Sequence, residues 1–340
     1  MSTDQAAACL SAQRIGIVGA GAIGGFLAAH LARTGHRVAM LARGETLHAL
    51  RAQGLRFVDR DGQQQVVRVR ACADVQEMGK QDLVILAVKG QVLSQIAASL
   101  APLISASSVV LTVGNGLPWW YFLFAGHPLQ GMRLKSVDPD GSIERALPLG
   151  QVLGASVMAS CHCPTPGTVV HSSGGRIVLG EPTGDTSARA ARWTALLQSA
   201  GLDAMLSVDI RQALWIKLLG NMCANPLSLL TEATTDRLLD DPGTRSVFAG
   251  LMSECIVLGR RVGLPLDVDI EARMAQTRAL GAIKTSMLQD LEAGRSVELD
   301  AIMGAPFECA KALGLEMPRI EMVLALARMR AARVSLAEKR

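Results

Sequence analysis

A lysine and two asparagines stand on one face of a largely apolar segment between residues 209 and 231. Lys217, Asn221 and Asn225 are four residues apart, so in an α-helix they fall within about 80° of arc. Polar side chains on such a helix line a polar cleft or form a buried network. A partly buried lysine can act as a general acid, and here it would protonate the alkoxide formed when hydride reaches a carbonyl carbon. The spacing leaves one alternative open, which is an ordinary lysine extending to solvent beside asparagines that cap backbone groups.

A glycine-rich loop near the start of the chain could hold the hydride donor. It follows an apolar run at residues 14–18, opens a helical pattern at 22–34, and precedes a second apolar run at 37–41. Its six residues fit the pattern GxGxxG: Gly19, Ala20, Gly21, Ala22, Ile23 and Gly24. The glycines of this pattern allow a tight turn, close approach of a pyrophosphate and close helix packing, while the helix N-terminus offers free N–H groups. An ordinary tight turn is the alternative, but the complete strand–loop–helix–strand unit favours dinucleotide binding.

The end of the second apolar run indicates which dinucleotide is bound. An NAD-binding chain usually places Asp or Glu there to hold the ribose hydroxyls. This chain has Leu41, Ala42 and Arg43, with no acid before Glu45. A guanidinium at this point can pair with a 2′-phosphate, so we expect NADP(H); the alternative is that Arg43 is an ordinary solvated charge.

Strands that alternate with helices are expected to position these residues. Four apolar runs separated by helical patterns predict a doubly wound parallel sheet, at residues 14–18, 37–41, 82–88 and 108–113. Three shorter pieces separated by Pro and Gly predict antiparallel strands, at residues 152–158, 168–171 and 176–180. Only helical patterns follow residue 209. We therefore expect an α/β, Rossmann-type NADP-binding domain at residues 13–208, followed by an all-α substrate and catalytic domain at residues 209–335.

Composition excludes several other classes of protein. Hydrophobic residues make up 49% of the 340 residues and charged residues 19%, which is typical of a folded core rather than of disorder. The net charge of +4 is scattered along the chain, so no nucleic-acid partner is expected. Residues 15–32 are uncharged but rich in glycine, so they predict no membrane span. Seven cysteines without a CxxC pair favour reduced thiols in the cytoplasm, and the spacing of Cys161, His162 and Cys163 is too tight for a usual zinc site, so we expect no metal.

Together the motifs resemble the ketopantoate reductase (2-dehydropantoate 2-reductase) family over nearly the whole chain. The matching stretches are GAGAIG, a VKG containing Lys89, a GNGLP containing Asn115, the stretch I-R-x-x-x-W-x-K-L-x-x-N-x-x-x-N-P, and S-M-x-Q-D-x-x-x-G-R-x-x-E-x-D, which contains Ser286 and Glu298. The resemblance implies a fold like that of 6-phosphogluconate dehydrogenase. It also implies an NADP-dependent oxidoreductase acting on a CH–OH group. The reaction would be NADPH-dependent reduction of ketopantoate, a small 2-oxo acid, to pantoate in pantothenate and coenzyme A synthesis.

The same resemblance implies roles for individual residues. Lys217 would be the general acid, and Glu298 would help to position it next to the substrate and the nicotinamide. Asn115 would contact both cofactor and substrate, and Lys89 would lie along the cofactor. The remaining substrate contacts would come from Asn221, Asn225 and Ser286.

Two positions depart from the family pattern. Thr235 stands where relatives often carry another asparagine, and four consecutive aromatics follow Asn115 at residues 119–122. These aromatics either pack a structural cluster or line the substrate pocket and change which acid fits. Two alternatives therefore stay open: the same chemistry on another branched or aromatic 2-oxo acid, and an NADP(H)-binding regulatory protein without turnover. The apolar surfaces of the helical domain would suit a homodimer.

Overall fold

The computed structural model of the chain describes residues 12–337, so Cys9 lies outside the described residues. Contacts divide the described residues into two compact units. Unit 1 comprises residues 12–114 and 142–210, and unit 2 comprises residues 115–141 and 211–337. Unit 2 therefore includes residues 115–141, which the sequence pattern predicts to be part of the first domain. The aromatic side chains explain the difference, because Tyr121 packs against Trp215 with ring centroids 6.1 Å apart and its hydroxyl donates to the Arg211 carbonyl oxygen at 2.9 Å.

Unit 1 is built on a ten-stranded sheet with the order β4-β3-β9-β8-β7-β6-β1-β2-β5, and β10 pairs with β9. Its strands are β1 (Arg14–Val18), β2 (Arg37–Leu41), β3 (Leu55–Val58), β4 (Gln64–Val67), β5 (Arg70–Cys72), β6 (Leu83–Leu86), β7 (Val109–Thr112), β8 (Val152–His162), β9 (Thr168–Gly180) and β10 (Asp203–Leu206). Strands β2, β1, β6, β7 and β8 run parallel, whereas β9 is antiparallel to β8. The predicted Rossmann-type sheet and the antiparallel pieces after residue 150 are both confirmed.

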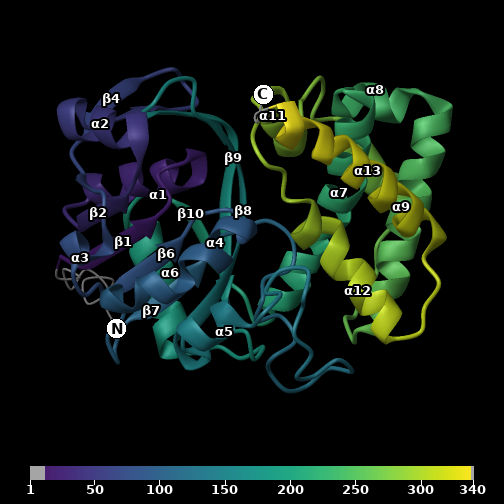
Figure 1. Cartoon of the computed structure of the whole chain (residues 1–340), viewed down its shortest axis with the longest axis horizontal. Coiled ribbons are helices and arrows are strands. Elements are labelled where there is room, and N and C mark those ends of the chain that lie inside the picture. Colours follow the sequence, from purple (N-terminus) through teal and green to yellow (C-terminus); the bar gives the residue numbers. More distant parts are fainter. Residues whose placement is uncertain (1–11, 338–340) are drawn as a thin grey trace, which may run out of the picture. The chain divides into compact units, whose positions relative to one another are not determined.

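Helices cover this sheet closely enough to bury its central strands. All residues of β6 and β7 are buried, as expected for parallel strands with both faces covered. Helix α1 (Ala22–Arg33) contacts strands from both halves of the sheet, including β2 and β9 (Figure 1). A Cβ built on Gly25 would lie only 2.5 Å from Val169 Cγ2, so the glycine permits this close packing on β9. The other helices of unit 1 are α2 (Gly44–Gln53), α3 (Val75–Met78), α4 (Gly90–Ile96), α5 (Ser142–Ala146) and α6 (Ala188–Ser199), with 3-10 turns η2 (Ala97–Leu103) and η3 (Leu149–Gln151).

Two parts of the sheet differ from the expectation, in addition to the short strands β5 and β10, which were not predicted. The predicted pieces at 168–171 and 176–180 form a single strand, β9, because the glycines between them are accommodated without ending it. Gly174 has φ +70°, and the register with β8 shifts between Met158 and Ala159. The antiparallel pair β3–β4 was not predicted, since Leu55–Val58 and Gln64–Val67 are short and partly exposed.

Unit 2 contains only helices among its described secondary structure elements, which confirms the predicted all-α region. They are α7 (Ile210–Thr231), α8 (Thr235–Asp240), α9 (Pro242–Arg261), α10 (Ile270–Arg278), α11 (Ser286–Glu292), the π-helical turn η4 (Asp300–Gly304), α12 (Ala305–Ala312) and α13 (Pro318–Ala337) (Figure 1). Helix α7 is the longest, with 22 residues, and it carries Lys217. Within residues 12–337, no helix combines the length and the apolar character needed to cross a membrane.

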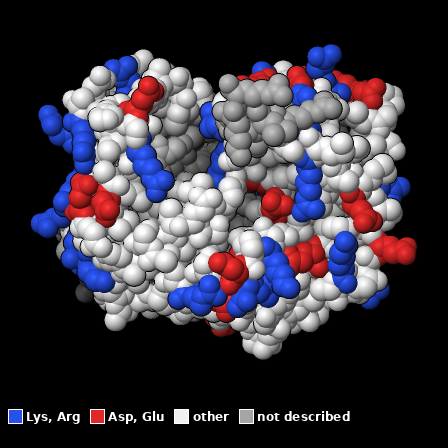
Figure 2. Space-filling view, in the orientation of Figure 1, with Lys and Arg blue, Asp and Glu red and all other residues white. Residues whose placement is uncertain are grey.

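Charged side chains of both signs are mixed on the surface. In the view of Figure 2, Lys and Arg lie singly or beside Asp and Glu on the described part of this face. Exposed ion pairs among the described residues include Arg278 with Asp240 at 2.5 Å and Lys284 with Glu292 at 2.7 Å.

Candidate active site

Lys217 lies at one end of a short chain of hydrogen bonds within unit 2. Its Nζ donates to Asn115 Oδ1 at 2.7 Å, and Asn115 Nδ2 donates to Glu298 Oε2 at 3.2 Å. Only one orientation of the amide suits both neighbours, since the oxygen must face the ammonium and the nitrogen must face the carboxylate. The structure thus brings together three of the residues singled out in the sequence, although Asn115 and Glu298 are 183 residues apart.

Burial sets the proton affinity of Lys217. It lowers the pKa of the Lys217 ammonium from 10.5 to about 8, and the negative charge of Glu298 partly opposes this shift by raising the pKa. An acid with a pKa of about 8 is protonated at neutral pH and still close enough to the working pH to give its proton up readily. These contacts disfavour the solvent-exposed alternative for this lysine, and its role as a general acid stays a prediction.

The two asparagines of α7, Asn221 and Asn225, follow Lys217 on the same face toward the C-terminal end of the helix. Asn225 is 5% exposed, and its Nδ2 has no hydrogen-bond partner among the described residues. Asn221, one turn nearer to Lys217, is only partly buried. A buried amide without a partner costs about 1–3 kcal/mol, so such a donor is typically satisfied by a ligand oxygen or by water.

Ser286 begins a capped helix but forms no hydrogen bond with the polar residues of α7. It is the exposed first residue of α11, and Thr285 caps that helix by accepting a hydrogen bond from the Leu288 N–H at 3.2 Å. The structure gives Ser286 no hydrogen bond to Lys217, Asn221 or Asn225. Its place in the site therefore stays a prediction.

Thr235, where the family pattern often has asparagine, forms structural hydrogen bonds. Its hydroxyl donates to the Gly281 carbonyl oxygen at 2.8 Å, and its backbone N–H donates to the Ile283 oxygen at 3.0 Å. Both bonds tie the start of α8 to the loop that leads to Ser286. The Thr235 hydroxyl is thus already engaged within the protein.

The aromatic run after Asn115 is part of the core of unit 2. All four side chains are at most 2% exposed: Trp119, Trp120, Tyr121 and Phe122. Tyr121 stacks on Trp120 and packs edge-on to Phe122, with ring centroids 6.2 and 4.8 Å away. These contacts favour the structural interpretation of this segment over a pocket wall.

The glycine-rich loop of unit 1 has the shape that a dinucleotide requires. Gly19 has φ +111°, and a Cβ there would lie 2.8 Å from the Ala87 carbonyl oxygen. A Cβ on Gly24 would lie 2.0 Å from the Gly19 oxygen, so α1 and the loop approach as closely as the pattern implies. Gly21, the N-cap of α1, instead faces open space, and no side chain caps the helix. The first N–H groups of α1 are therefore available to a pyrophosphate.

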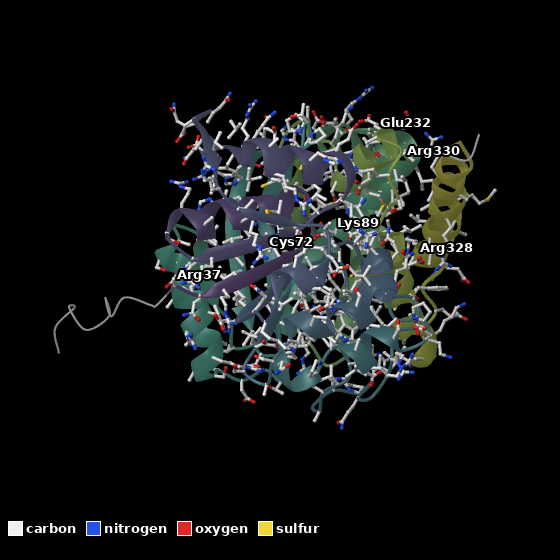
Figure 3. All side chains as sticks on the ribbon, turned by 60° about the vertical axis from the view of Figure 1, so that its left-hand side comes forward. Arg37, Cys72, Lys89, Glu232, Arg328 and Arg330 are labelled. Atoms are coloured by element: carbon white, nitrogen blue, oxygen red, sulfur yellow. The ribbon has the colours of Figure 1, made fainter. Side chains whose placement is uncertain are left out.

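The other residues predicted for the cofactor also lie in unit 1. Arg43 is exposed at the N-cap of α2, directly after β2, and Lys89 is the N-cap of α4 (labelled in Figure 3). A cavity of about 220 Å³ adjoins the loop at Ala20. Its wall includes Thr46 of α2 and the turn at residues 163–169. Nothing in this arrangement conflicts with a bound dinucleotide.

Gly21 allows a direct test of this fit. We expect Gly21→Ala to lower the affinity for NADPH by about tenfold or more, because the new methyl group would occupy the space into which the pyrophosphate fits. Thermal stability should change little, since that Cβ meets no atom within 4 Å. Gly150→Ala is the matched control, because its Cβ also meets nothing within 4 Å. Equal NADPH dissociation constants for the two variants, measured by nucleotide fluorescence, would contradict the assignment.

Other reactive groups are poorly placed for catalysis. Burial raises the pKa of the Cys223 thiol far above its usual range and that of Cys161 to about 12, so neither is a ready nucleophile. His171 is buried against Phe26, with ring centroids 4.7 Å apart, and burial lowers its pKa. Among residues 12–337, no group of three or more His, Cys, Asp or Glu side chains could hold a metal ion.

Comparison with known proteins agrees with both units. Residues 15–184 match the family model described as ketopantoate reductase PanE/ApbA, and residues 209–331 match its C-terminal counterpart. The chain is 40% identical to a 2-dehydropantoate 2-reductase of Mesorhizobium japonicum, covering 93% of this chain and 97% of that protein. It is 27% identical to a 2-dehydropantoate 2-reductase of a Nostoc species, covering 92% of this chain and 93% of that protein.

Solved structures extend the likeness to three dimensions. A candidate ketopantoate reductase from Ralstonia solanacearum superposes with a TM-score of 0.91 at 45% identity, covering 96% of this chain and 99% of that chain. A 2-dehydropantoate 2-reductase from Geobacter metallireducens gives a TM-score of 0.82 at 28% identity, covering 93% and 99%. The fold also matches a D-mandelate dehydrogenase, at 20% identity and a TM-score of 0.79 over 94% of this chain and 99% of that one. The resemblance found in the motifs is confirmed, and the chain belongs to the ketopantoate reductase family.

Proposed function

We propose that this chain reduces ketopantoate to pantoate, the reaction that supplies pantothenate and coenzyme A synthesis, with hydride from NADPH and a proton from Lys217. The observation that carries the proposal is the partly buried lysine, with a pKa of about 8, that Asn115 links to Glu298. The 40% identical relative named 2-dehydropantoate 2-reductase supports the choice of substrate. A binding-only regulator would need no acid of this kind.

The residues of unit 2 would handle the substrate. When bound, NADPH would supply a hydride to the carbonyl carbon of the 2-oxo acid. Lys217 gives its proton to the carbonyl oxygen as negative charge develops there, and Asn115 and Glu298 keep the ammonium oriented. Asn225 Nδ2, which has no partner among the described residues, would donate to a substrate oxygen, and Asn221 and Ser286 would provide further donors.

The residues of unit 1 would hold the cofactor. Gly19, Gly21 and Gly24 shape the pyrophosphate loop at the N-terminus of α1, and Lys89 would contact the cofactor nearby. Arg43, exposed at the N-cap of α2, would pair with the 2′-phosphate and so favour NADPH over NADH. Units 1 and 2 would thus act as the NADP-binding part and the substrate and catalytic part, respectively.

Two further proposals concern the setting of the enzyme. An odd set of seven cysteines, without a CxxC pair, fits a reducing compartment, so we place the chain in the cytoplasm. A homodimer stays a prediction that size measurement in solution can test.

The function is tested by following NADPH oxidation with ketopantoate and with a panel of other branched and aromatic 2-oxo acids. We expect rapid turnover with ketopantoate and little with the others. Turnover only with a bulkier acid would keep the chemistry and overturn the substrate. Tight NADPH binding without turnover on any acid would contradict the enzyme assignment.

A further inference from the structure

The segment that carries Asn115 rests directly on the helix that begins next to Glu298. The Leu117 N–H donates to the Ala301 carbonyl oxygen at 2.9 Å. Between Asn115 and Leu117, Gly116 has φ +78°, and a Cβ on it would lie 2.3 Å from the Ala301 oxygen and 2.4 Å from the Ala301 carbonyl carbon. Both are backbone atoms that cannot swing aside. Only glycine fits at this position unless the two segments separate.

A π-helical turn makes the Ala301 carbonyl available to Leu117. In this turn, Asp300–Gly304, the Ala305 N–H donates to the Asp300 oxygen, five residues back, instead of to Ala301 as in an α-helix. The next residue, Pro306, has no N–H that could donate to Ala301 in its place. The Ala301 oxygen therefore has no donor from these two helix positions, and the Leu117 N–H satisfies it.

The same two stretches are joined twice. Asn115 Nδ2 donates to Glu298 Oε2, and two residues later along the first stretch the Leu117 N–H donates to Ala301. Because the backbone bond and the glycine contact set how closely the stretches approach, they also set whether Asn115 can contact Glu298 and Lys217 at once. We propose that Gly116 and Pro306 are positioning residues, which seat the Asn115 segment on the π-helical turn and thereby align Lys217 for proton transfer. This inference rests on the proposed function, since it concerns the same lysine.

An ion pair on the same turn is a weaker candidate for this role. Asp300 Oδ1 lies 3.0 Å from Nη2 of Arg328 in α13 (Arg328 is labelled in Figure 3), but the two side chains are 61% and 53% exposed. Exposed pairs typically contribute at most about 1 kcal/mol. We therefore expect Asp300→Asn to leave kcat nearly unchanged, which separates the glycine contact from general support of the turn.

The decisive variant is Gly116→Ala, compared with Gly131→Ala. Gly131 has nearly the same φ, +79°, but a Cβ there meets nothing within 4 Å, so the control carries the backbone strain without the contact. We expect Gly116→Ala to lower kcat about 10- to 100-fold with little change in KM, because small displacements of catalytic groups have effects of this size. In this variant, the fall of kcat at alkaline pH should begin at a lower pH, because Glu298 raises the pKa of Lys217 and would lie farther away. Gly131→Ala should change neither quantity.

Two further measurements keep the test decisive. Amide hydrogen exchange at Leu117 should become faster in Gly116→Ala, independently of activity. If Gly116→Ala does not fold, Pro306→Ala replaces it, since the new N–H would compete for the Ala301 carbonyl and should produce the same changes to a smaller extent. A Gly116→Ala chain with the kcat, pH profile and Leu117 exchange of the natural chain overturns the inference. Failure of the natural chain to reduce any 2-oxo acid would instead overturn the proposed function. The exchange rate at Leu117 would still test the contact in that case, because slower or unchanged exchange in Gly116→Ala would contradict it.

Discussion

Lys217→Ala is expected to lower kcat for ketopantoate reduction by about 10²- to 10⁴-fold, the usual contribution of a positioned general acid. The reason is that, in the hydrogen-bonded chain of Lys217, Asn115 and Glu298, Lys217 is the group that would give a proton to the substrate. The change should appear mainly in kcat, because the asparagines of α7 remain to bind substrate. Steady-state NADPH oxidation at saturating ketopantoate measures it.

Two controls identify the cause of such a loss. Lys284→Ala removes another lysine of unit 2, one that forms an exposed ion pair with Glu292, and should leave kcat unchanged. Lys217→Arg keeps the positive charge but places a group there that does not release its proton near neutral pH, so it should restore little activity. A Lys217→Ala enzyme that retains kcat within a few-fold of normal would remove this lysine from the mechanism.

The second large effect is expected for Arg43→Ala, in cofactor preference. A charge-assisted hydrogen bond contributes about 1.5–3 kcal/mol, so losing the pairing with the 2′-phosphate should weaken NADPH binding by roughly 10- to 150-fold. NADH lacks that phosphate, and its dissociation constant should change little. Fluorescence titration of both nucleotides measures the ratio directly.

Arg37 offers a matched control for this experiment. Arg37 (labelled in Figure 3) is the exposed first residue of β2, whereas Arg43 follows the end of that strand, so Arg37→Ala removes the same charge without reaching the loop after β2. The ratio of the two dissociation constants should not move in this variant. Equal weakening of NADPH and NADH in Arg43→Ala would show that the guanidinium does not recognise the 2′-phosphate.

Local patterns were sufficient for much of the fold. Apolar runs such as Leu83–Leu86 are buried central strands, and the glycine-rich loop lies between β1 and α1 as its spacing predicts. The α-helical period likewise predicted Lys217 and Asn225 on one helix, because both signals depend only on residues close in sequence. Strand β9 was divided in two because glycines such as Gly174 commonly end strands, whereas here they form an irregularity within one.

Other features depend on contacts between distant residues. The bond between Asn115 and Glu298 joins residues 183 apart, and no period in the sequence indicates it. The motif containing Asn115 was recognised, yet the role of Gly116 follows only from the carbonyl of Ala301 against which it lies. The burial of Trp120 likewise required knowledge of its partners in unit 2. Such contacts arise from packing, which the local sequence does not encode.

The pH dependence of hydride transfer tests the central claim most directly. In a single turnover of NADPH with saturating ketopantoate, the reduction rate should be constant near neutral pH and fall above about pH 8, as Lys217 loses the proton that it must donate. Glu298→Gln should move this limb to lower pH, because the carboxylate that raises the pKa of Lys217 is gone. A rate that stays level to pH 10, in a chain that still binds NADPH and ketopantoate, would contradict Lys217 as the proton donor.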